Sequence, residues 1–119
     1  MPKFYHYSKC STCRAAQQWL EKKQQRLDAV DITENPPTSG QLKSILRASG
    51  KKITDLLNKS GEQYRLLNMK DKVKNLSEDQ LLEMLSKNGR LIKRPLVWEG
   101  SKATIGFKED EFNQTWNQP

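Results

Sequence analysis

Both cysteines of this chain and its single histidine lie within residues 6–13, in the stretch HYSKCSTC. Two cysteines separated by two residues at the start of a helix can close a small disulfide ring. The first amides of the helix and the positive end of its dipole favour a thiolate there over a neutral thiol. The first cysteine of such a pair commonly attacks the substrate, and the second resolves the mixed disulfide. We therefore predict that Cys10 is the nucleophile and Cys13 the resolving residue.

Positive charge surrounds this cysteine pair. Lys9 and Arg14 are close to it in sequence, and a protonated or hydrogen-bonding His6 can lower the pKa of a nearby thiol. Two other interpretations of the cysteines stay open, half of a zinc site and an inert pair. A structural zinc site wants four Cys or His ligands, and the chain has two cysteines and one histidine, so we expect no metal. A packed core residue and a functional residue are equally open interpretations of His6.

The elements that would position these residues begin with a strand–helix–strand unit. Residues 3–7 predict a short buried strand, followed by a helix that Ser11 or Thr12 caps and that ends near residues 23–25. A second strand over residues 27–32 ends before the proline pair 36–37. Such a unit prefers a right-handed crossover and parallel pairing.

The middle of the chain is predicted to be helical. Three capping boxes, each a Ser or Thr with Gln three residues later, begin at Thr38, Ser60 and Ser77. Apolar residues with helical spacing follow each box, and a short helix is predicted over residues 53–57. Gly50 and Gly89 stand where helices should end.

The last third predicts a hairpin and a final helix. Its strands cover residues 96–98 and 103–105, and Arg94-Pro95 stands directly before the first of them. An X-Pro bond is trans by default, but a proline that opens a strand beside a redox helix is a reason to expect cis. In that geometry Arg94 could face the cysteines and stabilise a thiolate or an oxyanion; otherwise it is a solvent-facing arginine.

Size and composition favour one cytoplasmic domain. The chain has 119 residues, of which 34% are hydrophobic and 29% charged, and the apolar residues form short clusters. It has neither an apolar run that could span a bilayer nor a secretory signal pattern. The net charge of +7 comes from scattered lysines and arginines. We interpret them as a solvated basic surface, with an anionic partner as the alternative, and expect no membrane and no direct nucleic-acid partner.

Motifs over nearly the whole chain, from Phe4 to about Trp116, carry a resemblance to a known family. They are the cysteine motif with the residues that flank it, Asn35-Pro36-Pro37, residues 91–97 (LIKRPLV) and residues 106–110 (GFKED). The chain resembles the arsenate reductase (ArsC) family and its Spx-like relatives, within the thioredoxin superfamily. The resemblance implies an α/β, thioredoxin-like fold with a four-stranded mixed sheet. It also implies a single domain over residues 1–119, with a redox core (1–35 and 91–117) and a helical insertion (36–90).

The same resemblance assigns roles to residues. It implies a cis bond at Pro95, attack by Cys10 on arsenate, and a histidine, His6, that tunes this cysteine. The residues that it implies for binding the oxyanion are Ser11, Thr12, Arg14 and Arg94.

Two departures from the family's pattern weaken the assignment to arsenate. Asn58 and Phe107 stand where glutaredoxin-dependent enzymes carry further arginines, and Cys13 stands where they typically have serine. A charge-assisted hydrogen bond from each of those arginines to an oxyanion would be worth about 1.5–3 kcal/mol. Without them, the affinity for an oxyanion should be much lower.

Two functions follow from the resemblance. The first is a thiol–disulfide oxidoreductase that needs no cofactor, acts as a monomer and is recycled by a reductant of the glutaredoxin/glutathione or thioredoxin type. The second is a redox-switched regulator, since the cysteine pair looks like that of the Spx proteins, which contact RNA polymerase.

Overall fold

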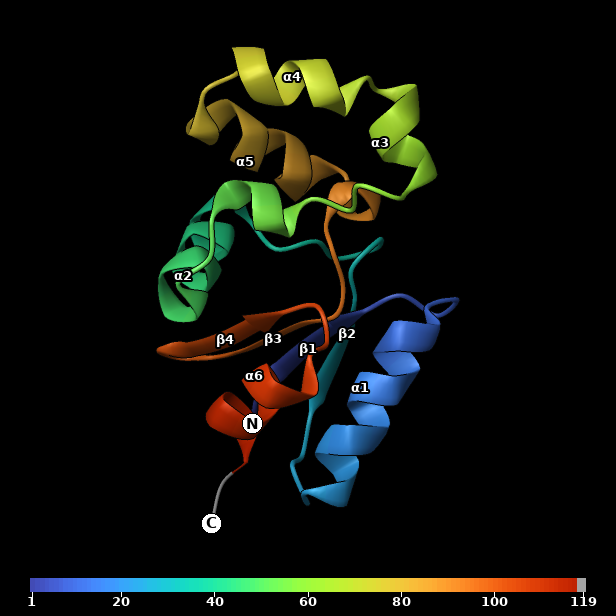
Figure 1. Ribbon diagram of the computed structural model, residues 1–119, viewed down its shortest axis with the longest axis vertical. Helices are drawn as coiled ribbons and strands as arrows, with labels where there is room; N and C mark the ends of the chain where they lie inside the picture. Colours follow the sequence, from blue (N-terminus) through green and yellow to red (C-terminus); the bar gives the residue numbers. More distant parts are fainter. Residues whose placement is uncertain (118–119) are drawn as a thin grey trace.

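The computed structural model describes residues 1–117, so the last two residues of the expected domain, 118 and 119, lie outside the described residues. One sheet with the strand order β2-β1-β3-β4 forms the centre of the molecule (Figure 1). Its strands are β1 (Lys3–His6), β2 (Asp28–Asp31), β3 (Leu96–Glu99) and β4 (Lys102–Ile105). β1 and β2 are parallel, whereas β3 is antiparallel to both β1 and β4. The prediction of a four-stranded mixed sheet is confirmed.

Two helices, α1 (Ser11–Lys22) and α6 (Glu109–Trp116), cover one face of the sheet (Figure 1). Their buried side chains pack with Phe4 of β1 and Val97 of β3, which are paired on these two neighbouring strands. The buried indole N–H of Trp116 donates to Thr104 Oγ1 at 2.9 Å, so neither polar group is left without a partner. Cys13 lies within this apolar cluster.

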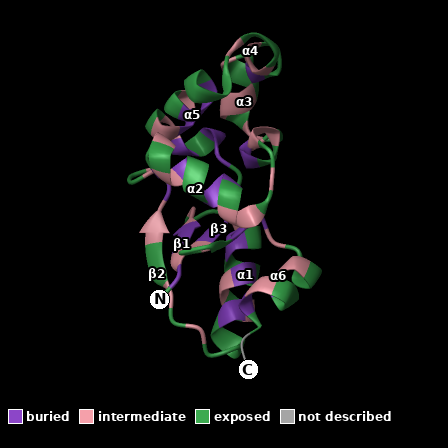
Figure 2. Cartoon of the chain, turned by 90° about the vertical axis from the view of Figure 1, so that its left-hand side faces the viewer, coloured by how far each residue is buried: buried purple, intermediate pink, exposed green. Residues whose placement is uncertain are grey.

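The helical insertion covers the opposite face. It contains α2 (Ser39–Ser49), η1 (Ile53–Leu56), α3 (Glu62–Leu66), α4 (Met69–Asn75), α5 (Glu78–Lys87) and η2 (Gly89–Leu91). Figure 2 shows that buried residues run through α2, α5 and the sheet beneath them. Tyr5 contributes to this cluster, whereas its neighbour Phe4 faces the other cluster, because successive side chains of a strand point to opposite faces.

Two of the three predicted capping boxes are present. The side chains of Thr38 and Ser77 accept the backbone N–H groups three residues later, at 3.1 and 3.2 Å, and the Gln side chains there bond back. The prediction for Ser60 is wrong, because α3 begins after Gly61 without a side-chain cap. The Ser60 hydroxyl instead lies 3.4 Å from Asn58 Oδ1, so it is directed away from the helix start.

The helix ends follow the sequence signals less closely. Gly50 ends α2 in the left-handed conformation (φ 68°) as predicted, but α5 ends at Lys87, and Gly89 opens η2 instead of stopping α5. The helix α4 was not predicted. It begins after Asn68, a residue type that is common at helix starts. The φ of Asn68 is 53°, and its side chain makes no capping bond.

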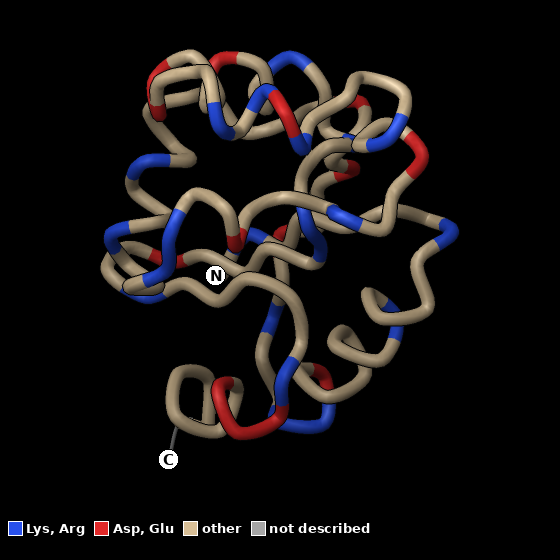
Figure 3. Tube along the Cα trace, turned by 45° about the horizontal axis from the view of Figure 1, so that its top comes forward, with Lys and Arg blue, Asp and Glu red and all other residues tan. Residues whose placement is uncertain are grey.

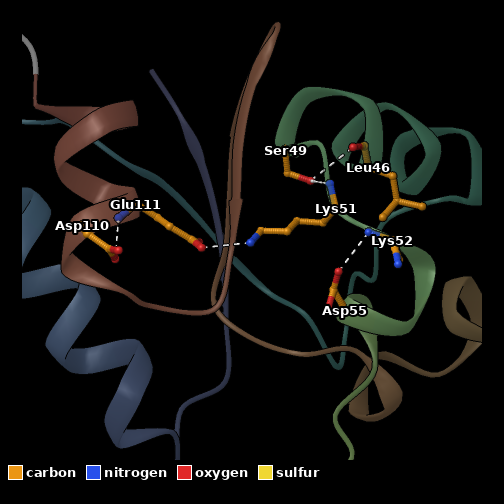
Figure 4. A network of polar contacts seen from close by, with 7 residues as sticks. All are labelled: Leu46, Ser49, Lys51, Lys52, Asp55, Asp110 and Glu111. Atoms are coloured by element: carbon orange, nitrogen blue, oxygen red, sulfur yellow. Dashed lines mark hydrogen bonds and ion pairs between the residues drawn. The ribbon is translucent and has the colours of Figure 1, made fainter.

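Polar contacts join the two layers around the free edge of β4. Lys51, which follows α2, reaches Glu111 of α6 with 2.9 Å between Nζ and Oε2 (Figure 4). The backbone N–H of Lys51 donates to Ser49 Oγ at 3.3 Å, which holds the base of this side chain against the end of α2. Glu111 raises the pKa of Lys51 through this hydrogen bond and its charge.

The other charges are spread over the surface. Figure 3 shows Lys and Arg positions along the whole trace, interspersed with acidic residues in the insertion. Within residues 1–117, no helix has the length and apolar character needed to cross a membrane.

Candidate functional site

Cys10 itself caps α1. Its sulfur accepts the backbone N–H of Cys13 at 3.1 Å, and its own N–H donates to the carbonyl of Tyr7 at 3.1 Å. The prediction that Ser11 or Thr12 is the cap is wrong, because Cys10 has the extended backbone of a cap and Ser11 is already helical. A sulfur that accepts the first amides of a helix lies where negative charge is most favourable.

Cys13 lies one turn further along α1 and is only 2% exposed. Burial raises the pKa of its thiol to about 12, the hydrogen bond to the Cys10 side chain acts in the same direction, and the charge of Arg94 opposes both. Cys13 is therefore a neutral thiol at neutral pH. Cys10 is partly exposed, and both cysteines are free in this structure.

This difference in burial predicts selective alkylation. At pH 7.5, about 4.5 units below the thiol pKa of Cys13, iodoacetamide should modify Cys10 more than about 100-fold faster than Cys13. The reason is that the thiolate is the reacting form. Peptide mapping by mass spectrometry after short exposures measures both rates. The unfolded protein in guanidinium is the control, in which the two rates should become similar. Faster modification of Cys13 in the folded protein would contradict the roles of the two residues.

The raised pKa also predicts a pH dependence of stability. The folded state holds the Cys13 proton more tightly than the unfolded chain does, where a thiol titrates at about 8.5. The free energy of unfolding of the reduced protein should therefore fall as pH rises from about 8.5 towards the folded value of about 12. Urea denaturation at several pH values measures this, with Cys13→Ala as the comparison that should show a shallower fall.

Arg94 enters the site from the start of β3. The Arg94–Pro95 peptide bond is cis, as expected. Tyr5 pairs with Leu96 across β1 and β3, and this register, continued for two residues, brings Tyr7 opposite Arg94. The guanidinium carbon lies 4.8 Å from the centre of the Tyr7 ring. Nη1 of Arg94 is buried and has no hydrogen-bond partner among the described residues.

A hollow of about 290 Å³ opens beside Cys10. Its lining residues include Cys10, Thr12 and the cations Lys93, Arg94 and Lys108, and no carboxylate is among them. The remaining lining residues come from the loop before α3 and the end of β4, namely Asn58, Ser60, Ile105, Gly106 and Phe107. The chemistry of this hollow suits an anionic or negatively polarised group next to the Cys10 sulfur.

Gly106 shapes the wall of this hollow. Its φ is 79°, which favours glycine, and a Cβ there would lie 2.9 Å from Cε of Lys93. The absence of a side chain at this position leaves room for the aliphatic part of Lys93. Phe107 packs edge-on against Phe112 of α6, with 4.7 Å between ring centres.

The structure brings together only part of the predicted set. Thr12 and Arg94 share the hollow with Cys10, whereas Ser11, Arg14 and His6 do not line it. Arg14 donates to the carbonyl of Ser8 at 3.2 Å. The ring of His6 stacks on Phe4, with 5.9 Å between ring centres and 20° between their planes.

No group of three His, Cys, Asp or Glu residues that could hold a metal ion is present within residues 1–117. The described part of one chain therefore does not supply a complete set of ligands for a zinc ion.

Sequence reasoning missed Tyr7, Ser60, Lys93 and Lys108. Tyr7 could have been found, because the pairing of the first and third strands places it near Arg94. Ser60 and Lys108 carry no local signal, since they reach the hollow only through the packing of the insertion and of the segment after β4.

The chain is similar to known proteins over nearly its whole length. The family model described as "ArsC family" matches residues 5–115. The chain belongs to the ArsC family. This ArsC family protein is 46% identical over 113 residues to "Uncharacterized protein YusI" of Bacillus subtilis, covering 95% of this chain and 96% of YusI. It is 27% identical to "Regulatory protein MgsR" of the same organism, over 92% of this chain and 85% of MgsR.

Solved structures place this ArsC family protein beside reductase-like folds. The structure described as "a possible arsenate reductase" from Streptococcus mutans is 41% identical, with a TM-score of 0.84. The match covers 92% of this chain and 96% of that one. The expected resemblance and the thioredoxin-like α/β fold are both confirmed.

Proposed function

We propose that this ArsC family protein is a thiol–disulfide oxidoreductase that cycles Cys10 and Cys13 between dithiol and disulfide. The observation that carries the proposal is the contrast between the two sulfurs. Cys10 lies at the N-terminal end of α1 and shares a hollow with three cations, whereas Cys13 is buried one turn further along the helix with a pKa raised to about 12. A pair of this kind is suited to a reducing compartment such as the cytoplasm.

The reaction proceeds in two exchanges. The Cys10 thiolate attacks one sulfur of the substrate disulfide, the substrate S–S bond breaks, and the first substrate thiolate leaves. Cys13 then loses its proton and attacks the Cys10 sulfur, which releases the second substrate thiolate and closes the Cys10–Cys13 disulfide. The substrate gains two electrons and the protein loses two. A dithiol or glutathione-type reductant returns them and restores the pair.

Proximity makes the raised pKa of Cys13 compatible with its role. Only a small fraction of Cys13 is thiolate at neutral pH, but the attack is intramolecular, and effective molarities in such reactions reach about 10⁵ M. The positive charge of Arg94 lowers the pKa of Cys13 and so favours the proton loss.

We infer a preference for disulfides over arsenate, because two positions at which the family pattern places oxyanion-binding arginines carry no charged donor here. Phe107 is packed against Phe112 and offers no donor, and Asn58 is neutral. Arg94 and Thr12 therefore remain as the oxyanion ligands expected from the family that line the hollow, and His6, Ser11 and Arg14 would have to act from outside it.

The test is turnover of purified protein with a disulfide and with arsenate, supplied separately with glutaredoxin plus glutathione or with thioredoxin. We expect disulfide reduction, and an oxidised protein that has lost two hydrogen atoms by mass spectrometry. A protein that forms no internal disulfide and reduces neither substrate would refute the proposal. Arsenate turnover faster than disulfide turnover would refute the substrate preference.

A second candidate is a redox-switched regulator, because relatives include proteins named MgsR and Spx that carry regulatory names. In this function the same disulfide would control binding to RNA polymerase. Capture of RNA polymerase by the oxidised but not the reduced protein, in the absence of any turnover, would favour the regulator over the enzyme.

A further inference from the structure

A second hollow, of about 160 Å³, adjoins the first on the side of Tyr7. Arg94 and Asn58 line both hollows, whereas Cys10 lines only the first. The second hollow is lined further by Arg90 and by the first residues of α3 with the glycine before them, Gly61, Glu62 and Gln63. A small molecule attached to Cys10 could therefore reach past Arg94 into a second polar site.

Arg94 is held between the hollows by an aromatic ring. Its guanidinium carbon lies over the Tyr7 ring, 4.8 Å from the ring centre, where a cation–π interaction holds the side chain. Nη1 is buried and has no hydrogen-bond partner within residues 1–117, and leaving a buried donor unpaired is energetically costly. An acceptor brought to Arg94 by a ligand would remove this cost.

Arg90 has a fixed backbone at the rim of the second hollow. Its N–H donates to Asn88 Oδ1 at 3.2 Å, and its carbonyl lies 3.4 Å from Nδ2 of Asn58. Asn88 also donates to Gln63 Oε1 at 3.2 Å, so the residues around the hollow are bonded to one another.

The charges of this hollow are incompletely balanced. Within residues 1–117 neither arginine makes an ion pair, and Glu62 is the single acidic residue of the lining. Two arginines and one glutamate therefore line this hollow. A planar carboxylate on a ligand matches the paired donors of an arginine better than any neutral group does.

We propose that the second hollow is a carboxylate-binding subsite, in which Arg90 and Arg94 hold an acidic group of a small disulfide while Cys10 attacks its sulfur. This inference rests on the proposed function and adds the class of substrate, a small anionic disulfide. Tyr7 is the positioning residue, because its ring holds Arg94 between the Cys10 sulfur and the carboxylate of the bound disulfide. Glu62 opposes the ligand and lowers its affinity.

The experiment compares two disulfide probes in single turnovers of the reduced protein. Dithiobis(nitrobenzoate) carries two carboxylates and dithiodipyridine carries no charge at neutral pH, and both release a coloured thiol when Cys10 attacks. The variants are Arg90→Gln and Glu62→Gln. Arg47→Gln is the matched control, because Arg47 is an exposed arginine of α2 that lines neither hollow.

The expected readout is the ratio of the second-order rate constants, anionic over neutral. Arg90→Gln should lower this ratio by about fivefold, and Glu62→Gln should raise it by about twofold, as expected for partly solvated charges. Arg47→Gln should leave it unchanged. Tyr7→Leu should lower it and Tyr7→Phe should retain it, since phenylalanine keeps the ring. Higher salt should shrink all of these differences.

Two outcomes would overturn the subsite. One is an unchanged ratio in both Arg90→Gln and Glu62→Gln, and the other is an equal fall in Arg47→Gln, which would show a general effect of net charge. Failure of the proposed function would look different. In that case wild-type Cys10 would react with both probes no faster than a cysteine of the unfolded chain.

Discussion

Cys10→Ser is expected to reduce disulfide turnover by more than about 100-fold, because a serine hydroxyl cannot supply the anionic nucleophile that a thiolate supplies. Cys13→Ser should behave differently. Its Cys10 still attacks, but no second sulfur is present to release the substrate, so a mixed disulfide should accumulate on Cys10. Turnover assays and intact-mass measurement of the adduct test both expectations.

The control for this pair is Cys13→Ala, which also removes the resolving sulfur and should trap the same adduct. Thermal unfolding of each variant separates loss of chemistry from loss of fold. Undiminished turnover in Cys10→Ser would show that the reaction does not begin at this sulfur. Undiminished turnover in Cys13→Ser would show that an external thiol resolves the intermediate, which is single-cysteine chemistry.

Gly89→Ala is expected to lower the free energy of unfolding by about 2–4 kcal/mol. A Cβ at this position would lie 1.9 Å from the carbonyl oxygen of Ile32 and 2.7 Å from its carbonyl carbon. Both are backbone atoms next to the end of β2, so a side-chain rotation cannot relieve the overlap. Urea denaturation of wild type and variant measures the loss.

Gly40→Ala is the matched substitution. Gly40 lies inside α2, and the nearest atom to an added Cβ is Thr38 Oγ1 at 4.0 Å, so alanine should raise stability by about 0.5–1 kcal/mol. Opposite signs for the two variants are the expected result. A Gly89→Ala protein within about 0.5 kcal/mol of wild type would contradict the close approach of η2 to β2.

The close approach at Gly89 also concerns the site. Gly89 begins η2, which contains Arg90 and is followed by Lys93 and Arg94. This glycine packs on the backbone after β2, and we expect the contact to help position the segment that carries both arginines. We expect Gly89→Ala protein that remains folded to behave like Arg90→Gln. Its ratio of rate constants, dithiobis(nitrobenzoate) over dithiodipyridine, should be lower than that of the wild type.

Much of the fold could be predicted from the sequence because its signals are local. Thr38 and Ser77 each lie three residues from the Gln that completes a capping box, and Gly50 ends α2 through its own conformation. The spacing of Cys10 and Cys13 needs only one turn of helix to bring the residues together. The resemblance to the family added the cis bond before Pro95 and the mixed sheet, which no local pattern determines.

The tertiary structure decided which side chains share the site. Cys10 takes the cap position that Ser11 and Thr12 were expected to take, and the hollow joins residues from both ends of the chain and from the insertion. Tyr7 and Arg94 meet because β1 and β3 pair in one register. Helix caps depend on a few neighbouring residues. The burial of Cys13, and the lack of an ion pair at Arg94 within residues 1–117, depend on packing between segments far apart in sequence. Packing of this kind cannot be predicted from any short stretch of the sequence.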